Sequence, residues 1–323
     1  MTDPLALGRG ERLLVLAPHP DDETLACGGL IQRVLAGGGE VRVLLATDGG
    51  SNPWPQRRVE RRWRLDPEAP ARWGARRLQE VRAALACLGA AESTLQPLGW
   101  TDQGLTAALL ADAGALQARL QREVEAFAPS MVAYPHVRDP HPDHAALGLL
   151  MEAALAGTVA PLRALGYLVH GPPPGAAADA ALTLSEDEFA RKRRAALAHW
   201  TQTRYGEAYL LRLVHAREVF LAARPWPPVA QAVLAWDWKG RWPLAARFTP
   251  DIAWLWQDAH GRLHGARLDA AAIAARGGGL QRGLRRVRLQ LPVDPARVRA
   301  AWARPLGPHR LVVYDAFGWR AAA

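Results

Sequence analysis

The feature that most constrains the fold is an alternation of short apolar runs with longer segments of helical length over the first two-thirds of the chain. Runs of about four to eight apolar residues indicate buried strands, and longer periodic segments indicate helices. Strands are expected at 13–17, 41–47, 95–98, 131–134 and 164–170, and helices at 24–36, 75–88, 116–127, 143–155 and 186–202. Such spacing is typical of βαβ units. The sequence therefore predicts an α/β fold with a Rossmann-like, mostly parallel sheet sandwiched by helices.

Two short clusters of histidine and aspartate follow two of these expected strands. His19-Pro20-Asp21-Asp22-Glu23 comes directly after the run 13–17, and His141-Pro142-Asp143-His144 comes shortly after the run 131–134. In open α/β sheets, ligands bind in the crevice beyond the carboxyl ends of the strands. Two strand ends at that edge can bring imidazoles and carboxylates around one ion. The pattern predicts a hydrolytic metal site built from loops.

The types of side chain in the two clusters suit zinc. Catalytic zinc sites use three nitrogen, oxygen or sulfur ligands from the protein and leave one position for water. We expect His19, Asp22 and His144 to be the ligands of one ion per chain, and the same set also suits another divalent ion. A bound ion of this kind lowers the pKa of water from about 15.7 to about 7.

The remaining side chains of the clusters have the chemistry of a general acid–base pair. Adjacent side chains diverge, so Asp21 is expected to point away from Asp22 and to take a proton from water, a role worth ~10²–10⁴ in rate. His141 precedes His144 by three residues, within one helical turn. It is expected to stabilise the oxyanion and to assist the leaving amine, with Asp143 as its orienting partner.

These residues resemble the PIG-L/LmbE family of zinc-dependent de-N-acetylases, which includes N-acetylglucosaminyl-phosphatidylinositol deacetylases and the deacetylases of mycothiol and bacillithiol synthesis. The resemblance rests on Ala17-Pro18-His19-Pro20-Asp21-Asp22-Glu23 with Cys27-Gly28-Gly29, and on Asp139-Pro140-His141-Pro142-Asp143-His144. It covers roughly residues 10–222. It implies zinc ligands, a general base and an oxyanion-stabilising histidine at the same five positions that coordination chemistry indicates.

Weaker similarities to the family lie between and after the clusters. They comprise Thr47-Asp48-Gly49, Arg77-Leu78-Gln79-Glu80, Asp102, Lys192, and His199-Trp200-Thr201-Gln202 with threonine in place of the usual serine. By resemblance, Arg77 contacts substrate hydroxyls or phosphate and Asp102 binds the sugar. For Arg77 the alternative to substrate contact is a structural ion pair, and for Asp102 the alternative to sugar binding is a structural role. Gly28-Gly29 is interpreted as allowing close helix–strand packing. Ser185 and Glu188 have the spacing of a helix capping box.

Two further regions differ in composition from the rest. Residues 51–74 are rich in Pro, Trp and Arg and are expected to be a functional or disordered loop. Its arginines at 57, 58, 61, 62 and 64 are interpreted as a solvated face rather than a phosphate clamp. Trp54, Trp63 and Trp73 are interpreted as core residues, with sugar stacking as the alternative.

Beyond Pro225-Trp226-Pro227-Pro228, runs at 233–238, 252–256, 287–291 and 311–315 predict short antiparallel strands. The expected division is a deacetylase domain at 1–224 and a small β-rich domain of unknown role at 225–323.

Composition narrows the functional classes. No run of 18 apolar residues predicts a membrane span, and residues 1–10 lack the pattern of a secretory signal. The two cysteines, Cys27 and Cys87, are expected to be free thiols, which favours the cytoplasm. The net charge is +9, but Lys192 and Lys239 are the only lysines and the arginines are spread along the chain. With abundant Ala, Leu, Gly and Pro, this distribution is typical of the coding bias of a GC-rich genome and argues against a nucleic-acid partner. An anionic substrate or a membrane surface is favoured somewhat over nucleic acid.

The sequence therefore predicts a cytoplasmic zinc-dependent hydrolase that removes an acetyl group from an N-acetylglucosamine-type conjugate. The partner is a small-molecule amino-sugar conjugate, which can be anionic or lipid-linked. One alternative keeps the site and changes the substrate to a thiol conjugate or an antibiotic sugar. The other is a non-catalytic carbohydrate- or nucleic-acid-binding protein. The sequence specifies no oligomeric state.

Overall fold

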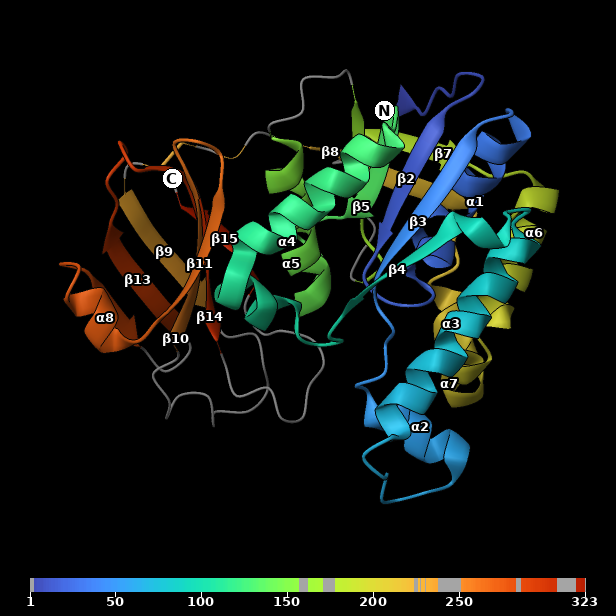
Figure 1. The fold of residues 1–323 in the computed structure, drawn as a ribbon, viewed down its shortest axis with the longest axis horizontal. Coiled ribbons are helices and arrows are strands. Elements are labelled where there is room, and N and C mark those ends of the chain that lie inside the picture. Colours follow the sequence, from blue (N-terminus) through green and yellow to red (C-terminus); the bar gives the residue numbers. More distant parts are fainter. Residues whose placement is uncertain are drawn as a thin grey trace. The chain divides into compact units, whose positions relative to one another are not determined.

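The computed structural model describes residues 3–156, 162–170, 178–223, 226, 228–229, 231–237, 251–282, 286–306 and 318–322 (Figure 1). These residues form two compact units. The first unit comprises 1–104, 123–136 and 160–223, and the second comprises 105–122, 137–159 and 224–323.

The first unit is built on an eight-stranded sheet in the order β1-β7-β8-β6-β5-β2-β3-β4. The strands are β1 (Asp3–Pro4), β2 (Arg12–Ala17), β3 (Glu40–Thr47), β4 (Leu95–Trp100), β5 (Met131–Pro135), β6 (Arg163–Tyr167), β7 (Ala180–Thr183) and β8 (Arg217–Ala222). β8 is antiparallel to both of its neighbours, and the other neighbouring pairs are parallel. The predicted α/β fold with a mostly parallel sheet is confirmed.

The position of β2 in this sheet is important for the site. From β2 the chain adds β3 and then β4 on one side, whereas β5 pairs with the other side of β2 and β6 follows it. Leu13 aligns with Val41 of β3 and with Met131 of β5. The strand order therefore reverses between β2 and β5, and ligands of open α/β sheets bind at such a switch point. The strands at the switch are the two that precede the histidine clusters.

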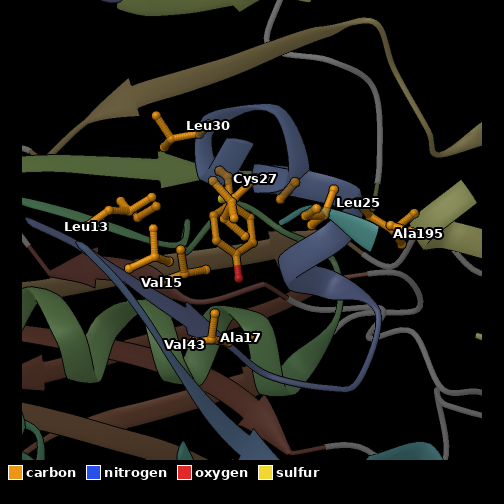
Figure 2. Packing of buried hydrophobic residues seen from close by; sticks show 14 of the residues in the cluster. Leu13, Val15, Ala17, Leu25, Cys27, Leu30, Val43 and Ala195 are labelled. Carbon is orange, nitrogen blue, oxygen red and sulfur yellow. The ribbon is translucent and has the colours of Figure 1, made fainter. Parts of the chain in front are cut away.

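The helices of the first unit are α1 (Asp22–Ala36), α2 (Pro53–Glu60), α3 (Ala69–Cys87), α6 (Glu186–Ala198) and α7 (Trp200–Arg212), with a 3₁₀ turn η1 (Glu92–Thr94). α1 packs on β2 and β3, α6 packs on α1 and α3, and α7 contacts α6 and α2. Figure 2 shows the core beneath α1, where Leu25, Cys27 and Leu30 meet Leu13 and Val15 of β2. Burying such side chains stabilises each by roughly 1.5–3 kcal/mol.

Close packing around α1 explains its glycine pair. A Cβ atom at Gly29 would lie 2.1 Å from Cδ2 of Leu184, which follows β7, and one at Gly28 would lie 3.0 Å from Cγ of Lys192 in α6. The predicted close packing at both glycines is confirmed, but the neighbours are the residue after β7 and helix α6 rather than a strand. Ser185 accepts a hydrogen bond from the Glu188 amide, and Glu188 accepts one from the Ser185 amide, so the predicted capping box is also confirmed.

Three sequence-based expectations for the first unit were wrong. The helix expected at 186–202 is two helices, because His199 leaves the helical conformation at φ −75° and ψ 65°. β7 and β8 were not predicted. Residues 51–74 are not a loop, since they contain α2 and the start of α3. Asn52 caps α2 by accepting from the Trp54 amide, and proline is tolerated in a first helical turn.

The tryptophans of residues 51–74 divide into two kinds. Trp73 is buried, as expected for a core residue, but Trp54 and Trp63 are 47% and 77% exposed. Core packing was therefore the wrong interpretation of Trp54 and Trp63. The expected connector at 171–175 and the expected strand at 311–315 lie outside the described residues.

The second unit combines helices with antiparallel strands. Its elements are residues 105–122 of α4 (Leu105–Phe127), α5 (Pro142–Leu155), β9 (Gln231–Asp237), β10 (Asp251–Asp258), β11 (Leu263–Leu268), α8 (Ala270–Ala274), β12 (Gly279–Arg282), β13 (Arg286–Pro292), β14 (Val298–Leu306) and β15 (Arg320–Ala322). The strands form two sheets, β11-β10-β14-β15 and β12-β13-β9, and every pairing in them is antiparallel. The expectation of antiparallel strands after residue 225 is confirmed.

Gln117 shows why α4 and α5 group with the C-terminal strands. Its side-chain amide donates to the carbonyls of Ala153 in α5 and Gly261 in the β10–β11 turn, and it accepts from the Leu263 amide. Separate domains at 1–224 and 225–323 stay a prediction about independent folding. Within the described ranges, no helix has the length and apolar character needed to cross a membrane.

Candidate metal centre

The loop after β2 carries the first cluster. The His19 amide donates to Oδ2 of Asp22 at 2.9 Å. The His19 ring lies between two carboxylates, with Nδ1 3.3 Å from Asp22 Oδ2 and Nε2 3.3 Å from Asp102 Oδ1. The side chains of His19 and both aspartates are at least about nine-tenths buried. The structure thus brings one predicted ligand pair together and adds Asp102 from the end of β4.

Asp102 is held as a carboxylate by its neighbours. Its Oδ2 accepts from the Ser51 amide at 2.7 Å. Burial acts to raise the pKa of Asp102, but His19, Arg77 and the Ser51 amide outweigh it, and the net effect lowers the pKa. An ionised, buried carboxylate beside a histidine ring is suited to orienting that ring or to binding a cation.

Asp21 and Asp22 point to different partners, as expected for adjacent residues. Asp21 precedes the first residue of α1 at φ 112°, a conformation that aspartate tolerates better than most residues. Its Oδ2 accepts from an Arg77 Nη2 at 3.3 Å, whereas Asp22 faces His19. Burial, and to a lesser extent Asp22, raises the pKa of Asp21 to about 6, against the opposing effects of Arg77 and His199.

Arg77 braces the loops around Asp21. Its Nη2 donates to the Pro20 carbonyl at 2.6 Å, and its Nη1 donates to the Gly49 carbonyl at 3.0 Å. A Cβ atom at Gly49, where φ is +66°, would lie 1.9 Å from Arg77 Nη1. These contacts account for the Thr47-Asp48-Gly49 turn and for an arginine at this position of α3. A contact between Arg77 and substrate stays a prediction.

A buried network around His199 was not foreseen as part of the site. His199 Nε2 lies 3.4 Å from Glu23 Oε1, and the Thr24 hydroxyl donates to the same oxygen at 2.7 Å. Burial acts to lower the pKa of His199, but Glu23 and Asp21 act against it and the net effect raises the pKa. Glu23, in the first turn of α1, therefore contacts the start of α7 through His199. The family-like segment at 199–202 was the signal in the sequence.

α7 is fixed to α3 beside this network. The Thr201 amide and hydroxyl donate to the two carboxylate oxygens of Glu80 at 2.9 and 2.7 Å. Both residues are buried. Threonine therefore supplies a hydroxyl donor to Glu80 at this position.

The second cluster lies at the start of α5. His141 caps the helix, and its Nδ1 accepts from the Asp143 amide at 3.2 Å. The ring centroids of His141 and His144 are 4.9 Å apart, and their ligand nitrogens lie within 4.8 Å of each other. Both side chains are buried. The sequence spacing therefore does place the two imidazoles side by side.

Asp139 is the residue of this cluster that sequence reasoning missed. Its Oδ1 accepts from the His141 amide at 2.9 Å, and its Oδ2 lies 3.3 Å from Nδ1 of His144. A carboxylate on one ring nitrogen leaves the other nitrogen to bind a metal. Asp143, the expected orienting partner of His141, contacts that ring through its backbone amide, and its carboxylate accepts from the Leu105 amide.

The donor chemistry of both clusters fits zinc. Imidazole nitrogens and carboxylate oxygens are ordinary zinc ligands, and these are buried and held by neighbouring groups. In the first unit, Asp22 also lies within 4.8 Å of a ring nitrogen of His170, which follows β6. The thiols take no part in this chemistry: Cys27 and Cys87 are free, as expected.

Known proteins are similar to the part of the chain that carries the two histidine clusters. Residues 14–155 match the family described as PIG-L: GlcNAc-PI de-N-acetylase. The 1D-myo-inositol 2-acetamido-2-deoxy-alpha-D-glucopyranoside deacetylase of Rhodococcus opacus is 34% identical over 166 residues, which are 46% of this chain and 54% of that relative. The matched region thus spans about half of the relative.

Two solved structures share the fold. N,N'-diacetylchitobiose deacetylase from Pyrococcus horikoshii has a TM-score of 0.53 and 19% identity, with 66% of this chain and 84% of that chain covered. The conserved protein TT1542 from Thermus thermophilus has a TM-score of 0.51 and 28% identity, with 68% and 97% covered. Both histidine clusters fall within the residues that match the PIG-L family.

Proposed function

We propose that this chain is a zinc-dependent hydrolase that removes an N-acetyl group from an N-acetylglucosamine-type conjugate. The observation that carries the proposal is topological. The two histidine clusters follow β2 and β5, which are neighbouring parallel strands on either side of the switch point. The family match at 14–155 includes both clusters and supports the same conclusion.

The proposed ligands of one zinc ion are His19, Asp22 and His144. They offer two nitrogens and one carboxylate, which leaves a position for water. Asp139 is proposed to orient the His144 ring through Nδ1, from which it lies 3.3 Å away. When bound, zinc supplies a water of lowered pKa and polarises the amide carbonyl.

Asp21 is proposed as the general base. It is separated from Asp22 by the turn in the backbone at φ 112°, so that it can accept a proton while Asp22 binds the ion. Arg77 holds the Asp21 carboxylate by a hydrogen bond at 3.3 Å and fixes the loop on which it lies. A base whose pKa lies near the working pH is effective, and burial shifts the pKa of Asp21 in that direction.

His141 is proposed to stabilise the oxyanion and to assist the leaving amine. Because its Nδ1 accepts from the Asp143 amide, the neutral ring carries its proton on Nε2. That nitrogen can donate to a developing negative charge. Asp143 is therefore proposed as a positioning residue that acts through its backbone amide.

The proposed substrate is a small amino-sugar conjugate, which can be anionic or lipid-linked, and acetate is the second product. The names of the Rhodococcus and Pyrococcus proteins both describe deacetylases of acetylated amino sugars. Asp102 and Arg77 are proposed to contact the sugar. The free thiols of Cys27 and Cys87 support a cytoplasmic location.

Metal content and acetate release test this proposal together. His19→Ala and His144→Ala are each expected to lose zinc while retaining the circular dichroism spectrum of the parent. His260→Ala serves as the matched control, because His260 is exposed on the β10–β11 turn of the second unit. Unchanged zinc content in both ligand variants would refute the site.

The variant Asp21→Asn tests the role of the general base separately from metal binding. It is expected to keep zinc and to lose about 10²–10⁴-fold in turnover of acetylated glucosamine conjugates. Turnover equal to that of the parent would exclude Asp21 as the base. Absence of acetate release from every acetylated amino sugar by the zinc-loaded parent would overturn the proposed function itself.

A further inference from the structure

A basic and aromatic hollow lies on the first unit, and none of its lining residues belongs to the histidine clusters. It has a volume of about 390 Å³ and is formed by α2, the turn after it and α7. Its lining residues are Trp54, Trp63 and Tyr205 together with Arg57, Arg58, Arg61 and Arg62. Figure 1 shows α2 and α7 side by side below the lower end of the sheet.

Exposed aromatic side chains concentrate around this hollow. In the part of the chain that the structure describes, seven large hydrophobic side chains are exposed, and six of them lie within 54–63 or 197–209. Trp63 is the most exposed of them at 77%. Trp200 and Tyr209 extend the aromatic surface along α7 beyond the hollow. Grouped exposure of this kind marks a contact surface, whereas single exposed hydrophobic residues are normal.

The arginines of the hollow have few anionic partners. Among the described residues, Arg57, Arg58 and Arg61 form no ion pair with a carboxylate, and the buried Nε of Arg57 has no hydrogen-bond partner. The carboxylates near them, Glu60 and Asp66, are paired with Arg72. The hollow therefore has an uncompensated positive charge.

Aromatic rings place these guanidinium groups at the surface. Arg57 lies over the Trp54 ring at 5.0 Å and over the Trp63 ring at 5.6 Å, and Arg58 lies over the Tyr205 ring at 5.8 Å. Side chains of this kind are amphipathic: the ring prefers the boundary between water and lipid, and the guanidinium prefers phosphate. Their combination matches the chemistry of a membrane surface that carries anionic headgroups.

We propose that this hollow docks the first unit onto an anionic phospholipid surface, with lipid phosphates against Arg57, Arg58 and Arg61 and the Trp54 and Trp63 rings in the headgroup layer. The exposed aromatic surface extends beyond the arginines. A soluble anion would leave those rings in water, whereas a bilayer buries them. The surface is independent of the proposed deacetylase chemistry, since none of its residues belongs to the histidine clusters.

Vesicle co-sedimentation tests this proposal. The full-length chain is expected to sediment with phosphatidylglycerol-containing vesicles and to stay in solution with pure phosphatidylcholine vesicles. Arg57→Gln/Arg58→Gln/Arg61→Gln is expected to lower the partition coefficient about a hundredfold, because each arginine near an anionic surface contributes about fivefold. Trp54→Ala/Trp63→Ala is expected to lower it as well, with the net charge unchanged.

The matched control removes the same charge elsewhere. Arg9→Gln/Arg122→Gln/Arg288→Gln replaces three exposed arginines outside the hollow and is expected to bind like the parent. Equal weakening by both triple variants would overturn the proposal in favour of a general charge effect. Equal binding of the parent to both kinds of vesicle, or to neither, would also overturn it.

Two further measurements complete the design. Glycerol 3-phosphate at millimolar concentration is expected not to displace the protein from vesicles, and displacement would indicate a soluble phosphate ligand instead. The triple hollow variant is expected to keep the zinc content and acetate release of the parent, so failure of the docking proposal and failure of the deacetylase proposal can be told apart.

Discussion

Replacing Lys192 by methionine should destabilise the first unit strongly. Lys192 in α6 and Glu218 in β8 form an ion pair at 2.7 Å, and their side chains are 0% and 1% exposed. Glu218 also accepts from the Gly29 and Leu30 amides of α1 at 2.6 and 2.9 Å. The pair therefore joins three elements of the fold. Methionine keeps most of the side-chain volume but leaves a buried carboxylate without its cation.

The stability that Lys192→Met can lose has an upper limit, because the buried carboxylate of Glu218 can bind a proton. A buried carboxylate that loses its partner costs about 3–5 kcal/mol. The variant can instead bind a proton, and protonating a glutamate of ordinary pKa ~4.3 at pH 7 costs roughly 3.7 kcal/mol. We therefore expect Lys192→Met to lose about 3–4 kcal/mol at pH 7. Binding a proton costs less at lower pH, so the deficit of the variant should be smaller at pH 5.5 than at pH 7.

Urea denaturation followed by circular dichroism at pH 7 and pH 5.5 measures this effect. The double variant Lys192→Met/Glu218→Gln is the control, because removing both charges of a buried pair is often neutral. It should recover most of the lost stability. A single variant within about 1 kcal/mol of the parent, or a double variant no more stable than the single one, would refute the assignment of this pair as a structural ion pair.

Three other contacts can be tested in the same way. Gly29→Ala should cost about 1–3 kcal/mol by thermal denaturation, because its Cβ would lie 2.1 Å from Leu184 Cδ2; a neutral effect would show that Leu184 moves aside freely. The hydrogen bond from Arg33 lowers the pKa of Glu188 to about 2, so its stabilisation is present above pH ~4.5 and is lost as the pH falls towards 2. Acid denaturation of Glu188→Gln should therefore converge with that of the parent near pH 2 and diverge above pH 5, and parallel curves would contradict this. Burial raises the folded-state pKa of Asp21 to about 6, so this carboxyl lowers stability progressively as the pH rises from about 4 to about 6, and the full cost is present above that pH. With metal removed by a chelator, the free energy of unfolding of Asp21→Asn should exceed that of the parent by roughly 3 kcal/mol at pH 7.5 and equal it near pH 3. A variant less stable than the parent at pH 7.5 would contradict the burial argument.

Local patterns explain which parts of the fold could be predicted. The runs at 13–17 and 131–134 form strands buried on both faces, and such strands are continuous apolar segments in any parallel sheet. β7 and β8 lack that signature, because β7 has four residues and β8 begins and ends with exposed residues. The prolines at 53 and 55 suggested a loop, although proline at the start of a helix is compatible with helical structure.

Contacts distant in sequence explain what could not be predicted about the site. The carboxylate of Asp102 lies against His19 because β4 and β2 end at the same edge of the sheet. His199 interrupts a helix and contacts Glu23. The family-like segment at 199–202 did not indicate which residue His199 would contact. Asp139 was visible in the sequence, but its two contacts with His141 and His144 depend on the turn that begins α5.

The sequence by itself determined which strands the two histidine clusters follow, and it predicts the chemistry proposed for them. Ligand type and helical spacing are properties of neighbouring residues, so His19, Asp22, His141 and His144 could be named as candidate site residues from the chain alone. Only the tertiary structure decided which carboxylate faces which imidazole, and which arginines form no ion pair with the residues that the structure describes. Those outcomes depend on strand order and on the packing of α2, α3 and α7, where the energy of each contact is set by residues far apart in the chain.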